Sequence, residues 1–264
     1  MIWFGDLNPI LQALIASTFT WGITLLGALM VCFFKEVNKK ALNTILGFSA
    51  GVMIAASFWS LLLPSIELSE ELGYIAWGLP ALGFILGGLF VLLSDKFLDK
   101  TLSDKNSIKK DSLKRSILLV SAITLHNIPE GMSIGVAFGG ISSGVSGMTL
   151  IGAIMLAVGI GIQNFPEGAA VSLPLRKEGF SRKKSFFIGQ ASALVEPISA
   201  VIGVILVLAV RSILPILLSF AAGAMITVAA RELLPESISE NKNLSTLGLI
   251  SGFVLMMVLD VALG

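Results

Sequence analysis

Long uninterrupted apolar runs constrain this chain more than any other feature of its sequence. Eight of them reach about 20 residues, enough for a helix to cross a hydrocarbon core roughly 30 Å thick. Only 13% of the 264 residues are charged and the mean hydropathy is +0.92, which excludes a water-soluble domain. The sequence predicts an all-α polytopic membrane protein with one transmembrane domain over residues 1–264. Its spans are expected near residues 9–33, 43–64, 73–94, 116–139, 147–175, 186–210, 212–235 and 244–263.

The basic residues between these runs predict the orientation of the chain. Of the 18 Lys and Arg, 16 lie in alternate connections, seven of them in the segment 95–115, and Arg211 is the only one in the other connections. By the positive-inside rule, both termini are expected outside and 95–115 is expected to be a cytoplasmic loop. Topology accounts for these charges, so the net charge of +1 predicts no nucleic-acid partner.

Two short segments recur in opposite halves of the chain. Ala-Gly-Val-Met-Ile at 50–54 returns as Ala-Gly-Ala-Met-Ile at 222–226, and the Leu-Leu-Pro at 62–64 returns at 233–235. The two spans that carry them would run in opposite directions. The repetition therefore predicts inverted repeats in a 3+2+3 arrangement, which in transporters bind substrate near the midplane on interrupted helices.

Prolines are expected to make those interruptions in three spans. Pro129, Pro166 and Pro197 each remove the donor for the carbonyl four residues earlier. A carbonyl freed inside a membrane needs water, a side chain or an ion. All three prolines adjoin an acidic residue, so ordinary helix kinks explain the pattern poorly.

Two similar blocks carry most of the polar chemistry. They read His-Asn-Ile-Pro-Glu-Gly at 126–131 and Gln-Asn-Phe-Pro-Glu-Gly at 163–168. Positions i and i+4 share a helix face, which places His126 beside Glu130 and Gln163 beside Glu167. The asparagine after His126 or Gln163 lies three residues before the glutamate of its own block. Ionisable groups at this depth are costly unless they bind something, so the blocks predict a buried cation site.

Imidazole and carboxylate ligands favour a divalent cation of borderline character. Zinc, ferrous iron and manganese fit such a set, whereas Cys32 is alone and no thiolate cage can form. A dication would also relieve the repulsion between buried carboxylates. Glu196, in the sixth span, adds a third acid. Met53 by itself indicates no more than core packing.

These residues together resemble one known family. The paired Asn-x-Pro-Glu-Gly blocks, the Val-Glu-Pro at 195–197 and eight spans with outside termini are similar to the ZIP (Zrt/Irt-like) metal-ion transporters. The short length resembles the GufA-like prokaryotic branch. The resemblance covers essentially the whole chain, and the paired blocks are highly specific.

The resemblance implies a binuclear metal site halfway along a transport pathway. One ion would be held by Met53, His126, Glu130, Gln163 and Glu167. The other would be held by Asn127, Glu130, Asn164, Glu167 and Glu196, the first two glutamates bridging. Some family members carry Asp where Asn164 stands, so the second site here has one charge fewer. The family moves metal into the cytoplasm by an elevator-like sliding of one helix bundle against another.

The resulting hypothesis is a transporter rather than an enzyme. It would move zinc foremost, and also iron, manganese or cadmium, across a cell membrane, with a bacterial plasma membrane expected. The metal is cargo and no catalytic cofactor is implied. A metal-selective channel stays open as an alternative. An intramembrane zinc hydrolase, which usually needs two or three histidines, is disfavoured by the single His126. A carrier of organic solutes would work without divalent metal. The expected partners are the metal ion and the lipid bilayer, with a homodimer as one open assembly.

Overall fold

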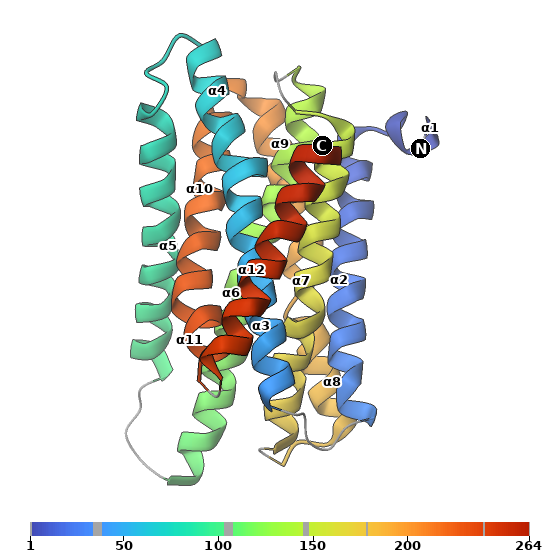
Figure 1. Cartoon of the computed structure of the whole chain (residues 1–264), viewed down its shortest axis with the longest axis vertical. Coiled ribbons are helices and arrows are strands. Elements are labelled where there is room, and N and C mark those ends of the chain that lie inside the picture. The colour runs from blue at the N-terminus through green and yellow to red at the C-terminus, as the bar shows by residue number, and fades with distance from the viewer. Residues whose placement is uncertain are drawn as a thin grey trace.

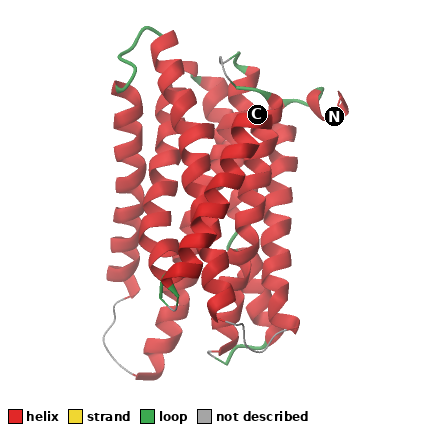
Figure 2. Ribbon diagram, in the orientation of Figure 1, coloured by secondary structure: helices red, strands yellow, loops and turns green. Residues whose placement is uncertain are grey.

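The computed structural model describes residues 2–33, 39–102, 108–144, 148–177, 179–239 and 241–263, and all regular secondary structure in these ranges is helical (Figure 2). The helices run roughly along one axis as a bundle (Figure 1). Their bounds are α1 Ile2–Gly5, α2 Pro9–Phe33, α3 Lys39–Ala56, η1 Ser57–Leu62, α4 Leu63–Glu71, α5 Gly78–Leu102, α6 Ile108–Ser142, α7 Leu150–Lys177, α8 Arg182–Ala191, α9 Val195–Ala209, η2 Arg211–Ile213, α10 Leu214–Val228, η3 Ala229–Leu233, α11 Leu234–Ser237, α12 Lys242–Val258 and η4 Leu259–Leu263.

Six helical stretches among the described residues are long and apolar enough to cross a membrane. They coincide with six of the eight predicted spans, and they make the chain a multi-pass membrane protein. The other two predicted spans are also helical, in α5 and α6, although the strongly apolar part of α5 is limited to Gly78–Ser94. Helix also continues into the basic segment 95–115, because α5 extends to Leu102 and α6 begins at Ile108.

The helices pack as two groups. The most extensive contacts of the first group join α3 to α12 and α5 to α10; those of the second join α2 to α7 and α6 to α9. Helix α8 belongs to the second group through α2 and α7. The groups meet mainly where α3 lies on α7 and where α10 lies on α6. In Figure 1, α5 and α10 lie on the left, and α2 and α8 on the right.

The repeated Ala-Gly-x-Met-Ile segment marks matching contacts within the first group. A Cβ on Gly51 would overlap the carbonyl oxygen of Leu249 in α12, and one on Gly223 would overlap that of Phe84 in α5. Only glycine lets these backbones approach so closely, as small residues do in many membrane helix pairs. The sequence repeat therefore corresponds to a repeated mode of packing.

Two of the recurrent segments also share a local irregularity. Before the prolines of their Leu-Leu-Pro segments, α3 and α10 widen into the single π-helical turns η1 and η3. Such turns absorb an extra residue within a helix and often lie at functional sites. The elements α1, α4 and η4 all lie toward the same end of the bundle, here called the terminal end (Figure 1).

We predict that Gly51→Ala destabilises the protein, because the added methyl meets backbone atoms that cannot move aside. The free energy of unfolding should fall by about 1–3 kcal/mol, as for other overpacked cores. The matched control is Gly22→Ala, since a Cβ there has no neighbour within 4 Å. Thermal melting of the purified proteins in one detergent compares them, and an equal melting temperature for both variants would contradict the packing argument.

Candidate metal site

The polar residues of the two blocks are buried in the second helix group. Side chains of Asn127 and Glu130 in α6, and of Gln163, Asn164 and Glu167 in α7, are each 2% exposed or less. Glu196, in the first turn of α9, is fully buried. His126 lies within α6, but its side chain is outside the described residues.

One amide–carboxylate pair joins the two blocks directly. Gln163 donates a hydrogen bond from Nε2 to Oε1 of Glu130, which ties α7 to α6. The backbone oxygen of Gln163 accepts a hydrogen bond from Ser49 Oγ in α3, at 3.2 Å. Met53 is fully buried and follows Ser49 by four residues, on the same face of α3. This face lies toward α7, so the first group also contributes to the surroundings of the blocks.

A second amide–carboxylate pair joins α7 to α9. Asn164 Nδ2 lies 2.9 Å from Glu196 Oε1 and donates to it. The other carboxylate oxygen of Glu196 accepts a hydrogen bond from the Thr20 hydroxyl in α2. Glu196 also lies in the first turn of α9, near the positive end of that helix dipole. Three helices therefore hold one buried carboxylate.

The helix is interrupted at only one of the three predicted prolines. Helices α6 and α7 continue through Pro129 and Pro166, so the predicted breaks there are wrong. The sixth span does break, between Ala191 and Val195. The backbone carbonyl that loses its helical donor at this break is not the one that the sequence predicted.

The side chain of Asn127 donates a hydrogen bond to the backbone at the break in the sixth span. The Ala193 oxygen, expected to lack a donor, accepts the Glu196 N–H at 3.0 Å. The Ser192 oxygen instead accepts from Asn127 Nδ2 at 3.0 Å. A side chain from α6 thus satisfies the interrupted backbone, which is the usual requirement for non-helical backbone at membrane depth.

Three amide oxygens remain available at this place. Asn127 Oδ1, Gln163 Oε1 and Asn164 Oδ1 are buried and have no hydrogen-bond partner among the described residues. A buried polar atom without a partner costs about 1–3 kcal/mol, so these three oxygens are acceptors that a donor or a cation would satisfy. Within the described ranges, no three His, Cys, Asp or Glu side chains gather closely enough to hold a metal alone. A cation bound here would therefore depend on amide oxygens as well as carboxylates.

The glycine that ends each block brings its helix close to a neighbour. A Cβ on Gly131 would overlap the Glu196 carbonyl oxygen in α9, and one on Gly168 would overlap the Thr24 carbonyl oxygen in α2. The blocks thus combine polar residues with the small residue that sets the helix spacing. Sequence reasoning noted these glycines without assigning them a role.

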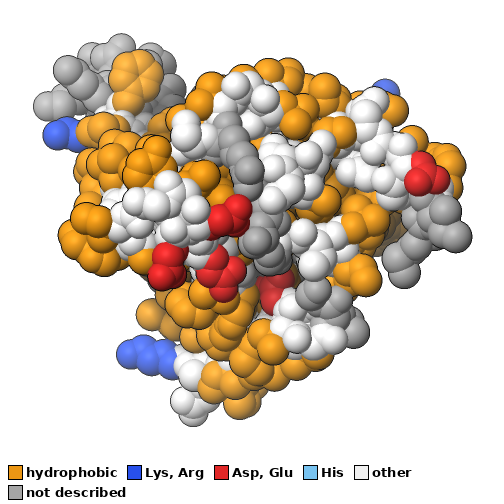
Figure 3. All heavy atoms as spheres, turned by 90° about the horizontal axis from the view of Figure 1, so that it is seen from above, with side chains coloured by type: hydrophobic (Ala, Val, Ile, Leu, Met, Phe, Trp, Pro, Cys, Tyr) orange, Lys and Arg blue, Asp and Glu red, His pale blue; other side chains and the backbone are white. Residues whose placement is uncertain are grey.

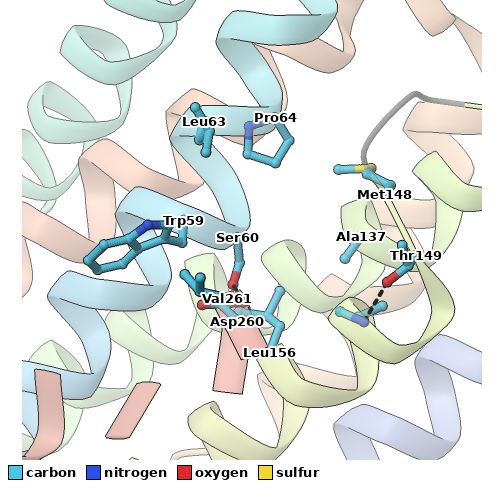
Figure 4. A pocket seen from close by; sticks show the side chains of 12 residues that line it. Trp59, Ser60, Leu63, Pro64, Ala137, Met148, Thr149, Leu156, Asp260 and Val261 are labelled. Carbon is cyan, nitrogen blue, oxygen red and sulfur yellow. Dashed lines mark hydrogen bonds between the residues drawn. The ribbon is translucent and has the colours of Figure 1, made fainter. Parts of the chain in front are cut away.

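A separate cavity of about 230 Å³ lies near the terminal end, between η1, η4 and α7 (Figure 4). Ser60 donates to Asp260 Oδ1 at 2.6 Å, and the buried Oδ2 has no partner in the described part of the chain. Sequence reasoning missed Asp260 and Thr20. The signal for each was a polar residue inside an apolar span.

The fold and the buried carboxylate–amide pairs define a multi-pass helical membrane protein with a polar site inside its spans. Residues 104–260 match the family model described as ZIP Zinc transporter. The chain is 37% identical to the zinc transporter ZIP11 of Xenopus tropicalis, over 97% of this chain and 98% of that protein.

Bacterial relatives are similar along the whole chain as well. Identity is 34% to the zinc transporter GufA of Myxococcus xanthus, over 95% of this chain and 98% of that one. Identity is 37% to the zinc transporter ZIPB of Bordetella bronchiseptica, over 96% of this chain and 81% of that one. The chain belongs to the ZIP zinc transporter family, which confirms the resemblance inferred from the paired blocks, including the GufA-like branch.

We predict that Thr20→Val weakens the hold on Glu196. Because a buried carboxyl oxygen loses its partner, the free energy of unfolding should fall by about 1–3 kcal/mol. Thr24→Val is the matched control, because the only described hydrogen bond of that hydroxyl is to the Thr20 oxygen of its own helix, at 3.3 Å. Melting curves of the single variants and of Thr20→Val combined with Glu196→Gln measure the coupling, and strictly additive effects would contradict the bond.

Proposed function

We propose that this protein carries divalent transition-metal ions, zinc foremost, across the membrane into the cytoplasm, without enzymatic activity. The observation that carries the proposal is the pair of buried carboxylate–amide contacts, Glu130 with Gln163 and Glu196 with Asn164, inside a ZIP-family chain. Relatives that match nearly the whole chain are named zinc transporters. Iron, manganese and cadmium suit the same ligand types and are proposed as further substrates.

The proposed site holds two metal ions. One ion would contact Met53, His126, Glu130, Gln163 and Glu167. The second would contact Asn127, Asn164 and Glu196 and share the two bridging glutamates, Glu130 and Glu167. The three amide oxygens without a described partner support this assignment, because they supply acceptors that only a cation or a donor can satisfy. The second set is the weaker one, since Asn164 is neutral.

The side chains would exchange partners as metal arrives. The bond from Gln163 to Glu130 occupies one carboxylate oxygen, and the bonds to Glu196 occupy both of its oxygens. Metal binding at these oxygens requires the amides to turn and present oxygen in place of nitrogen. Between transport events, when no dication offsets their charge, the buried acids are stabilised by the hydrogen bonds from the amides.

The proposed membrane arrangement has eight spans, in a 3+2+3 inverted repeat, with both termini outside. The matched packing of Gly51 and Gly223 supports the repeat. The exposed acids Glu67, Glu70 and Glu71 of α4 lie toward the terminal end, where acidic side chains gather in the view from above (Figure 3). The exposed basic residues at the start of α8 lie at the opposite end (Figure 1), and they support the orientation.

Movement of one helix group against the other is the proposed means of transport. Asn127, Glu130, Gln163, Asn164, Glu167 and Glu196 all belong to the second group, while Met53 belongs to the first. A rigid second group could therefore carry most of the ligands as one body past a stationary first group. A metal-selective channel is the alternative. Its uptake rate would not saturate with metal concentration in the way that the rate of a carrier does. An intramembrane zinc hydrolase is the less favoured one.

We predict that Glu130→Ala and Glu167→Ala each reduce zinc uptake to the background of protein-free vesicles, because each removes a proposed bridging carboxylate. Uptake is followed in proteoliposomes that contain a zinc-sensitive dye, under an imposed zinc gradient. Glu70→Ala, which removes an exposed acid of α4, is the control and should retain parental uptake. Parental rates in either block variant, at equal reconstitution, would sink the proposed site.

We predict that His126→Ala changes metal preference. Imidazole is the only nitrogen ligand proposed, so its loss should reduce zinc uptake by about tenfold or more relative to manganese uptake. The two metals are compared in the same vesicles, with Glu70→Ala as the control for reconstitution. Equal losses for zinc and manganese would count against His126 as a ligand.

A further inference from the structure

A groove of about 350 Å³ lies between α6 and α8, on the second helix group. Its walls are Val120 and Thr124 of α6, and Phe187, Ile188 and Ala191 of α8. Helix α7 underlies it, because Val171 and Leu175 form a buried cluster packed against Val120 and Ile188. The groove therefore has an apolar floor, apolar walls and an open side.

The polar groups along the groove are satisfied internally, with one exception. The Thr124 hydroxyl donates to the Val120 oxygen at 2.7 Å, and the Ser192 hydroxyl donates to the Gly189 oxygen at 2.8 Å. Lys184, at the mouth, is exposed and has no carboxylate partner among the described residues; its ammonium lies 4.7 Å from the centre of the Phe180 ring. The groove thus offers one positive charge at one end and apolar surface along its length.

The dimensions of the groove match one leaflet of a bilayer. From Lys184 to Ser192 the chain rises about 12 Å as a helix, close to half of a hydrocarbon core roughly 30 Å thick. Arg182 and Lys183 precede Lys184 at the end of the bundle opposite to the terminal end. Polar headgroups of the membrane would lie at this level, with acyl chains beside the rest of α8.

We propose that an anionic phospholipid binds in this groove, with its phosphate at Lys184 and an acyl chain along Phe187, Ile188 and Ala191. An anionic lipid is favoured over a zwitterionic one, because the cation of a zwitterionic headgroup offsets the attraction between its phosphate and the Lys184 ammonium. The apolar length above Lys184 selects a long chain over a soluble phosphate. The inner end of the chain would reach Ser192, whose carbonyl accepts the hydrogen bond from Asn127. Binding does not depend on the proposed transport, so it can be tested even if transport fails.

Native mass spectrometry of the purified full chain, titrated with dioleoyl phosphatidylglycerol or dioleoyl phosphatidylcholine, tests the site. The parent should retain one phosphatidylglycerol more tightly than phosphatidylcholine. Lys184→Ala should raise the apparent Kd for phosphatidylglycerol about fivefold or more, because a charge-assisted contact with the phosphate is lost. Lys184→Arg should restore binding. Ala191→Phe, which fills the groove and keeps the charge, should weaken both lipids.

Lys183→Ala is the matched control, since Lys183 is the exposed neighbour and does not line the groove. An equal loss for Lys183→Ala would show diffuse surface attraction and overturn the site. Equal affinity of the parent for the two lipids would overturn anionic recognition, and unchanged binding by Ala191→Phe would overturn the placement of the chain. Lipid-free melting curves identify any misfolded variant. If Lys184→Ala misfolds, Lys184→Met, a second neutral replacement of similar length, measures the contribution of the positive charge in its place.

Discussion

Each of two buried carboxylates is held by an amide of α7, and much of the site depends on this constraint. An acid inside a membrane protein must be paired, bonded or neutralised. Glu130 meets this requirement through Gln163, and Glu196 meets it through Asn164 together with Thr20. Because α7 supplies both amides, it fixes α6 on one side and α9 on the other. Gly131 and Gly168 let α6 approach α9 and α7 approach α2, so the helices around both pairs lie close together.

The sequence predicted the fold class and the location of the polar residues because both follow from strong local signals. Apolar runs of membrane length specify helices, and a repeated polar block within them is difficult to explain as packing. The pairing of Gln163 with Glu130 was not predictable, since helix geometry alone placed Gln163 beside Glu167. Contacts between helices depend on their rotation and depth, and the sequence of one chain does not report either.

The prolines show where a local rule is insufficient. All three were expected to interrupt their helices, yet α6 and α7 absorb Pro129 and Pro166 without a break. Ahead of Pro197 the helix does break, between Ala191 and Val195, and a neighbouring helix has a side chain, Asn127, positioned to bond the freed Ser192 carbonyl. Whether a proline breaks a membrane helix thus depends on the partners that other helices provide, which is tertiary information. Thr20 is similarly visible in the sequence as a polar residue inside an apolar span, but only the fold shows that its partner is Glu196.

The choice of asparagine at position 164 has a consequence for protons. A carboxylate offers acceptors only, whereas an amide carries both a donor and an acceptor. Asn164 now donates to Glu196, and half a turn of its terminal group would let it accept a hydrogen bond from the same acid once protonated. An aspartate at 164 would have no donor for an ionised Glu196, so the pair would have to share a proton or a cation. An asparagine can stay bonded to either form of Glu196, so the contact between α7 and α9 does not depend on the charge of that acid.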